Sequence, residues 1–78
     1  GQLLEALDRT GQGKDTLVIA TGDNGAARRS YPPLRDAKSS IYEGGHREPF
    51  VARWPGHIKA NSVCGQTVCL NDFLATCA

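Results

Sequence analysis

Residues 16–25 read Thr16-Leu17-Val18-Ile19-Ala20-Thr21-Gly22-Asp23-Asn24-Gly25. The first five form a nearly continuous β-branched and aliphatic run, which is typical of a strand buried on both faces. Two polar side chains, Asp23 and Asn24, follow where that strand ends. Because α/β folds usually bind ligands at the carboxyl ends of their strands, this run predicts an α/β fold with a candidate site directly after the strand.

Regular elements are expected on both sides of this strand. Apolar side chains at helical spacing predict a helix over residues 2–10, and residues 50–54 form a second strand candidate that Pro55-Gly56 ends. Asn71 is expected to cap a final helix. This order of elements predicts a layered fold with parallel strands. Two strands are too few for a stable sheet, and helical patterns reach both ends of the chain, so we expect a segment of a larger domain.

Positive charge is concentrated in the middle of the chain. The net charge of +1 is too small to favour a nucleic acid or a membrane surface as a partner. The longest aliphatic run, residues 17–20, is also too short to span a bilayer. Residues 22–45 are rich in turn formers and predict a long loop. Positive charge exceeds negative charge over residues 25–53, which indicates either an anion-binding loop or a solvated basic loop.

Cys64, Cys69 and Cys77 form an odd set with no C-x-x-C pair and no histidine at zinc spacing. They predict neither a disulfide framework nor a zinc module, and we expect ordinary buried or half-buried thiols.

Asp23-Asn24-Gly25 offers two adjacent hard oxygen donors, which suit Ca²⁺ or Mg²⁺. The alternative for the tripeptide alone is an Asx turn in which the glycine supplies a positive φ. An EF-hand is excluded, because its ligand pattern and its closing glutamate are missing.

A longer signature lies downstream. Residues 38–56 read Lys38-Ser39-Ser40-Ile41-Tyr42-Glu43-Gly44-Gly45-His46-Arg47-Glu48-Pro49-Phe50-Val51-Ala52-Arg53-Trp54-Pro55-Gly56. This run resembles the sulfatase signature K-x-x-x-[YW]-E-G-G-x-R-x-P, which leads into a strand ending in W-P-G. Asp23-Asn24-Gly25 is similar to the metal-binding D-N-G of that family, and residues 72–76 resemble the helix that follows in arylsulfatases. The resemblance covers about residues 15–78.

The resemblance implies that residues 1–78 are a C-terminal-side part of a sulfatase catalytic domain, with an alkaline-phosphatase-like layered fold and a mostly parallel central sheet. It implies hydrolysis of sulfate esters, of small molecules or carbohydrates, with bound Ca²⁺ rather than Mg²⁺. Asp23 and Asn24 match two metal ligands, and Lys38 matches the lysine that contacts the sulfate. His46 occupies a variable position and is a weaker candidate for substrate contact. Export to a periplasmic, secreted or lysosomal compartment is suggested by the resemblance alone.

The nucleophile of the family is a formylglycine made from a Cys or Ser in [CS]-x-[PA]-x-R, and no cysteine here begins that motif. We expect it upstream of Gly1, in the rest of the sulfatase chain, so these 78 residues alone should be inactive. Two alternatives stay open: a stand-alone anion-binding or interaction module, and a phosphatase or phosphonate hydrolase of the same superfamily. Asn24 argues against the second, because two-metal relatives are expected to have a histidine there.

Several smaller expectations concern the signature itself. The family usually has glycines before the sulfate lysine, whereas Asp36 lies two residues before Lys38 here. An inward-facing carboxylate there would oppose sulfate binding, so we expect Asp36 to point to solvent. Arg47 and Glu48 are expected to form an ion pair that stabilises the glycine turn. Trp54 is expected to pack against other residues rather than bind a ligand.

Overall fold

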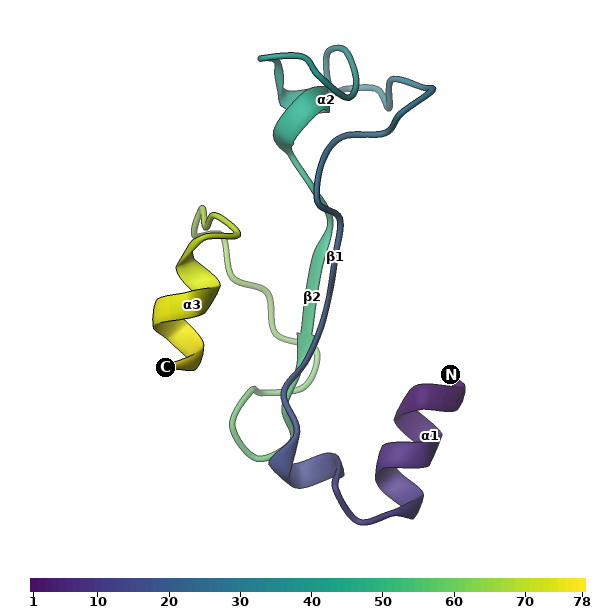
Figure 1. The fold of residues 1–78 in the computed structure, drawn as a ribbon, viewed down its shortest axis with the longest axis vertical. Helices are drawn as coiled ribbons and strands as arrows, with labels where there is room; N and C mark the ends of the chain where they lie inside the picture. Colours follow the sequence, from purple (N-terminus) through teal and green to yellow (C-terminus); the bar gives the residue numbers. More distant parts are fainter.

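The computed structural model describes all of residues 1–78. A two-stranded sheet lies at the centre of the molecule. The molecule is elongated, with principal extents of 42 × 27 × 22 Å. Helix α1 lies at one end of the sheet, the loop that carries α2 lies at the other, and α3 lies beside the strands (Figure 1). The elements in chain order are α1 (Gln2–Arg9), the 3-10 helix η1 (Gly13–Asp15), β1 (Val18–Thr21), α2 (Glu43–His46), β2 (Phe50–Arg53) and α3 (Asp72–Cys77).

The strands β1 and β2 pair antiparallel, with Val18 opposite Arg53 and Thr21 opposite Phe50. The expectation of parallel strands is therefore wrong for this pair. A parallel partner would require the chain to cross to the opposite end of the sheet. Here the loop closes at its base, where the Gly25 N–H donates to the Gly45 carbonyl oxygen at 2.9 Å. The chain consequently enters β2 at the end at which it left β1.

Local sequence explains where the helices end. Helix α1 ends at Arg9. The hydroxyl of its C-cap residue Thr10 donates to the Ala6 carbonyl oxygen at 2.9 Å, and Gly11 then turns the chain with a φ of 75°. The helix predicted over residues 2–10 is thus confirmed. Helix α3 is also present, but Asn71 makes no side-chain cap. Asn71 thus occupies the N-cap position as predicted but does not cap the helix with its side chain, and the Asp72 carboxylate accepts the Cys69 N–H at 2.8 Å.

Two side-chain contacts attach the N-terminal elements to β2. The Trp54 indole Nε1 donates to the Lys14 carbonyl oxygen at 3.0 Å, and its ring stacks on His57 with centroids 4.1 Å apart. Arg53 pairs with Asp8 of α1 at 3.1 Å. Trp54 therefore packs, as predicted.

Burial within these residues is slight. No hydrophobic side chain is fully buried; the buried residues are Gly13, Gly25, Gly44 and Gly45. In β1, Val18 and Ile19 are half-buried and Ala20 and Thr21 are exposed, so the expectation of a strand buried on both faces is not met within residues 1–78. The three cysteines are free and exposed, which corrects the expectation of buried thiols.

The overall dimensions agree with this open arrangement. The radius of gyration is 15.2 Å, against about 11.5 Å for a compact domain of this length. The accessible surface of 6838 Å² is about 2,200 Å² more than a compact protein of this mass exposes. None of the helices has both the length and the apolar character that a bilayer crossing requires.

Candidate functional site

The candidate site is built on close backbone contacts between glycines. Gly25, which follows β1, lies against the first turn of α2, and a Cβ added to it would overlap the Gly44 carbonyl oxygen and approach the Gly45 Cα to 2.8 Å. Only a residue without a Cβ permits this approach. The glycines thus hold the segment after β1 directly against the E-G-G turn.

The middle of the loop folds onto the same turn. The Gly44 N–H donates to the Arg35 carbonyl oxygen at 2.8 Å, and a Cβ on Gly44 would overlap the Asp36 carbonyl oxygen. A Cβ on Gly45 would likewise overlap the Ser40 carbonyl oxygen. Segments that are far apart in the sequence are therefore layered on α2, a helix of only four residues.

Lys38 is brought next to the segment that follows β1. Its N–H donates to the Ala26 carbonyl oxygen at 3.1 Å, and its neighbours Asp36 and Ser39 have positive φ values of 68° and 72° that turn the chain on both sides of it. The Asp36 carboxylate accepts the Ala37 N–H at 2.9 Å and is exposed. The expectation that Asp36 points to solvent is confirmed.

Asp23 and Asn24 present oxygen atoms at the end of β1. Asp23 is exposed, and the half-buried Asn24 uses its Nδ2 to donate to the Gly25 carbonyl oxygen at 3.0 Å, which leaves its Oδ1 as an acceptor. Carboxylate and amide oxygens are the donors that Ca²⁺ takes, so the pair fits such an ion. No group of three or more His, Cys, Asp or Glu side chains that could hold a metal ion gathers anywhere in residues 1–78, this site included. The pair can supply only part of the six to eight ligands of Ca²⁺.

The charged residues around α2 are arranged differently from the sequence expectation. Arg47 pairs with Glu43, one helical turn earlier, at 3.3 Å, so the predicted pairing of Arg47 with Glu48 is wrong. Glu48 instead turns toward Gly22, and its Oε1 is buried without a hydrogen-bond partner. The His46 Nε2 lies 3.2 Å from the Ile41 carbonyl oxygen.

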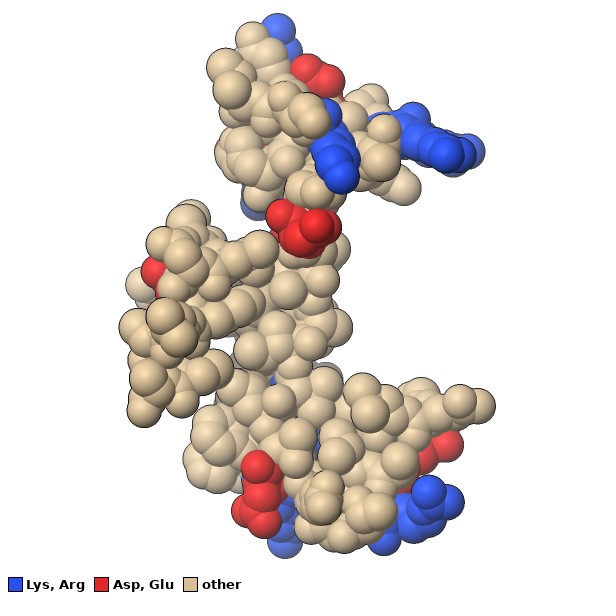
Figure 2. Space-filling model, in the orientation of Figure 1, with Lys and Arg blue, Asp and Glu red and all other residues tan.

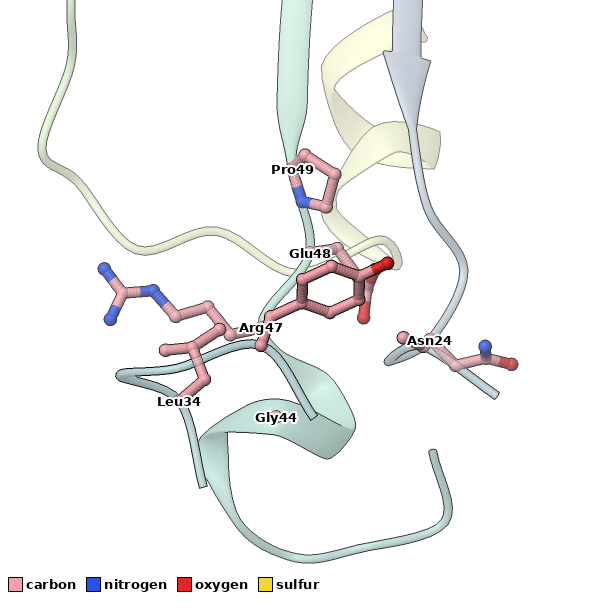
Figure 3. A pocket seen from close by; sticks show the side chains of 8 residues that line it. Asn24, Leu34, Gly44, Arg47, Glu48 and Pro49 are labelled. Carbon is pink, nitrogen blue, oxygen red and sulfur yellow. The ribbon is translucent and has the colours of Figure 1, made fainter. Parts of the chain in front are cut away.

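A pocket of about 410 Å³ adjoins Asn24. In Figure 3 Pro49 lies at its β2 end, Gly44 lies at its α2 end, and Asn24 and Leu34 lie on opposite sides. Its lining comprises Asn24, Ala26, Tyr31, Leu34, Gly44, Arg47, Glu48 and Pro49. Sequence reasoning did not find Tyr31 and Leu34, because they flank two prolines in a loop without periodicity.

Comparison with known families identifies a relationship over the whole chain, because the Sulfatase family model matches residues 1–78. The chain belongs to the sulfatase family. The resemblance based on residues 38–56 is thereby confirmed. The roles of Asp23, Asn24, Lys38 and His46 stay predictions.

Named sulfatases align with nearly the whole chain. N-acetylgalactosamine-6-sulfatase of Mus musculus is 41% identical over 97% of the chain, and arylsulfatase A of Homo sapiens is 40% identical over all of it. Steryl-sulfatase of Mus musculus is 33% identical, also over the whole chain. The chain spans only 16% of the length of the first two and 14% of the third. No solved structure matches it significantly.

Proposed function

We propose that residues 1–78 are part of a sulfatase that hydrolyses sulfate esters, and that they supply two Ca²⁺ ligands and one sulfate-binding cation. The observation that carries the proposal is the hydrogen bond between the Lys38 N–H and the Ala26 carbonyl oxygen at 3.1 Å. This bond joins the backbone of the signature lysine to Ala26, two residues after Asn24, although Lys38 lies well downstream in the sequence. It supports a metal site and an anion site that are neighbours, and such an arrangement would stabilise the charge that develops on a sulfate ester.

Each residue has a defined role in this proposal. Asp23 and the Asn24 Oδ1 hold Ca²⁺ together with ligands from outside these residues. The bound ion supplies positive charge that stabilises the negative charge developing on the sulfate oxygens. The Lys38 ammonium is a compact cation that binds one sulfate oxygen. The glycine contacts keep Lys38 and the metal ligands in fixed relative positions.

The nucleophile is assigned outside this chain. The three exposed cysteines do not lie in a formylglycine motif, so we assign the formylglycine to a part of the full-length protein outside residues 1–78. The 78 residues alone should therefore be inactive. A sulfated small molecule or carbohydrate is the proposed substrate, which agrees with the names of the aligned sulfatases. A non-catalytic binding module is the less favoured alternative, because the relatives named above carry the names of enzymes.

The test is hydrolysis by the full-length protein of 4-nitrophenyl sulfate and of 4-nitrophenyl phosphate in parallel. We expect release of nitrophenol from the sulfate, loss of that activity with a chelator, and recovery with CaCl₂. Faster hydrolysis of the phosphate would assign the site to a phosphatase. No hydrolysis of either ester, in protein with its formylglycine formed and Ca²⁺ present, would favour the binding module.

A further inference from the structure

The loop between β1 and β2 carries more cations than its own acidic groups neutralise. Arg47 is paired with Glu43, and the Arg35 guanidinium lies 3.6 Å above the centre of the Tyr42 ring. Three further cations of the loop are exposed and take part in no ion pair: Arg28, Arg29 and Lys38.

These three cations belong to one part of the loop. Lys38 is hydrogen-bonded through its backbone to Ala26, which lies two residues before Arg28. Figure 2 shows Lys and Arg side chains projecting from the end of the molecule that this loop forms. Of the acidic residues nearest these arginines along the chain, Asp23 is a proposed Ca²⁺ ligand and Asp36 accepts the Ala37 N–H through its carboxylate, and neither forms an ion pair with Arg28 or Arg29. Arg28 and Arg29 thus offer unpaired positive charge two and three residues beyond the backbone contact with Lys38.

We propose that Arg28 and Arg29 bind a second anionic group of the substrate, a sulfate or a carboxylate, while Lys38 binds the sulfate that is cleaved. The inference rests on the proposed function and narrows its substrate class to molecules with several anionic groups. A guanidinium presents a planar set of donors that matches the oxygens of both groups. Each exposed contact is weak and screened by salt, so the surface selects substrates in which two or more anionic groups bind together.

The experiment measures direct binding of fluorescently labelled dextran sulfate to the full-length protein by anisotropy at low salt. The test variant is the double substitution Arg28→Ala and Arg29→Ala. The matched control is Lys14→Ala and Lys59→Ala, which removes two exposed cations outside the loop. Unlabelled polygalacturonate and inorganic sulfate, used as competitors, separate carboxylate from sulfate recognition and a multiply charged ligand from a single anion.

We expect the arginine variant to bind dextran sulfate at least about tenfold more weakly and the lysine control to change by less than about twofold. Replacement of both arginines by lysine should retain most of the affinity, because the charge remains. Added salt should weaken the wild type more than the arginine variant. Competition by polygalacturonate that falls in the arginine variant would show that carboxylates are also accepted.

Three results would overturn the inference: no loss of affinity in the arginine variant, equal losses in both double variants, or an equal loss for inorganic sulfate. An equal loss of affinity for inorganic sulfate would mean that the arginines bind the same anion as Lys38 and not a second one. Because binding is measured without turnover, a protein that cleaves no sulfate ester but still shows the arginine effect would contradict the proposed function alone.

Discussion

Lys38 has a fixed backbone position, because its N–H bonds to Ala26 and positive φ values flank it at Asp36 and Ser39. If its ammonium binds the sulfate, Lys38→Ala should lower kcat/KM for an aryl sulfate at least about tenfold, since a charge-assisted contact is worth roughly 1.5–3 kcal/mol. His46→Ala should do much less, because the His46 ring is in contact with the Ile41 carbonyl within its own turn. Both variants of the full-length protein are assayed, and a melt confirms that each is folded. The assignment would be wrong if His46→Ala were the more damaging.

A substitution at Gly25 tests how closely the loop is packed. A Cβ at this position meets the backbone of Gly44 and Gly45, which cannot move aside as a flexible side chain could. Gly25→Ala should destabilise the full-length protein by about 1–3 kcal/mol and lower its melting temperature. Gly65→Ala is the matched control, because a Cβ there has open space around it. Equal melting temperatures for the two variants would show that the packing at Gly25 is looser than described.

At the scale of elements, Trp54 joins the end of β2 to η1. Trp54→Phe keeps an aromatic ring over His57 but removes the donor to the Lys14 carbonyl oxygen. We expect a loss of about 0.5–1.5 kcal/mol in the free energy of unfolding, measured with urea on the full-length protein. His57→Ala is the complementary variant, since it removes the stacked ring and keeps the hydrogen bond. An unchanged midpoint in Trp54→Phe would mean that water replaces the indole donor without cost.

The elements themselves could be predicted from local patterns, but their pairing could not. Helical spacing near the N-terminus and the apolar run before Asp23 locate α1 and β1 closely. The antiparallel direction depends on the contact between Gly25 and Gly45, which are far apart in the sequence and carry no periodic signal. The apolar run of β1, taken alone, therefore predicts one strand of a parallel set, and nothing local corrects that prediction.

The candidate site, too, could be predicted from the sequence only in part. The D-N-G run and the lysine are visible as motifs, because residue type alone suggests metal and anion binding. The partner of Arg47 is one turn away along α2, so it depends on a helix within a run of turn formers that gave no helical signal. Tyr31 and Leu34 reach the pocket only through the fold of the loop.

At the scale of the molecule, residues 1–78 lack a hydrophobic core of their own. Leu3, Ile41 and Leu74 are each more than half exposed, and the sheet has only two strands. Two strands without a packed face are marginally stable at best. We expect the isolated 78-residue chain to be poorly folded or self-associated, without a sharp thermal transition by circular dichroism. A cooperative melt in a monomer would contradict this, because it would require a core that the structure does not contain.

Residues 1–78 are proposed to hold only part of a Ca²⁺ site, whose remaining ligands come from the rest of the full-length protein. Calorimetric titration with CaCl₂ of the full-length protein, its Asp23→Ala variant and the isolated 78-residue chain tests that claim directly. We predict stoichiometric Ca²⁺ binding by the full-length protein, much weaker binding by the variant, and no specific uptake by the isolated chain, since two ligands cannot satisfy the ion. Micromolar, stoichiometric binding by the isolated chain, or an Asp23→Ala variant that binds as tightly as the wild type, would contradict the account.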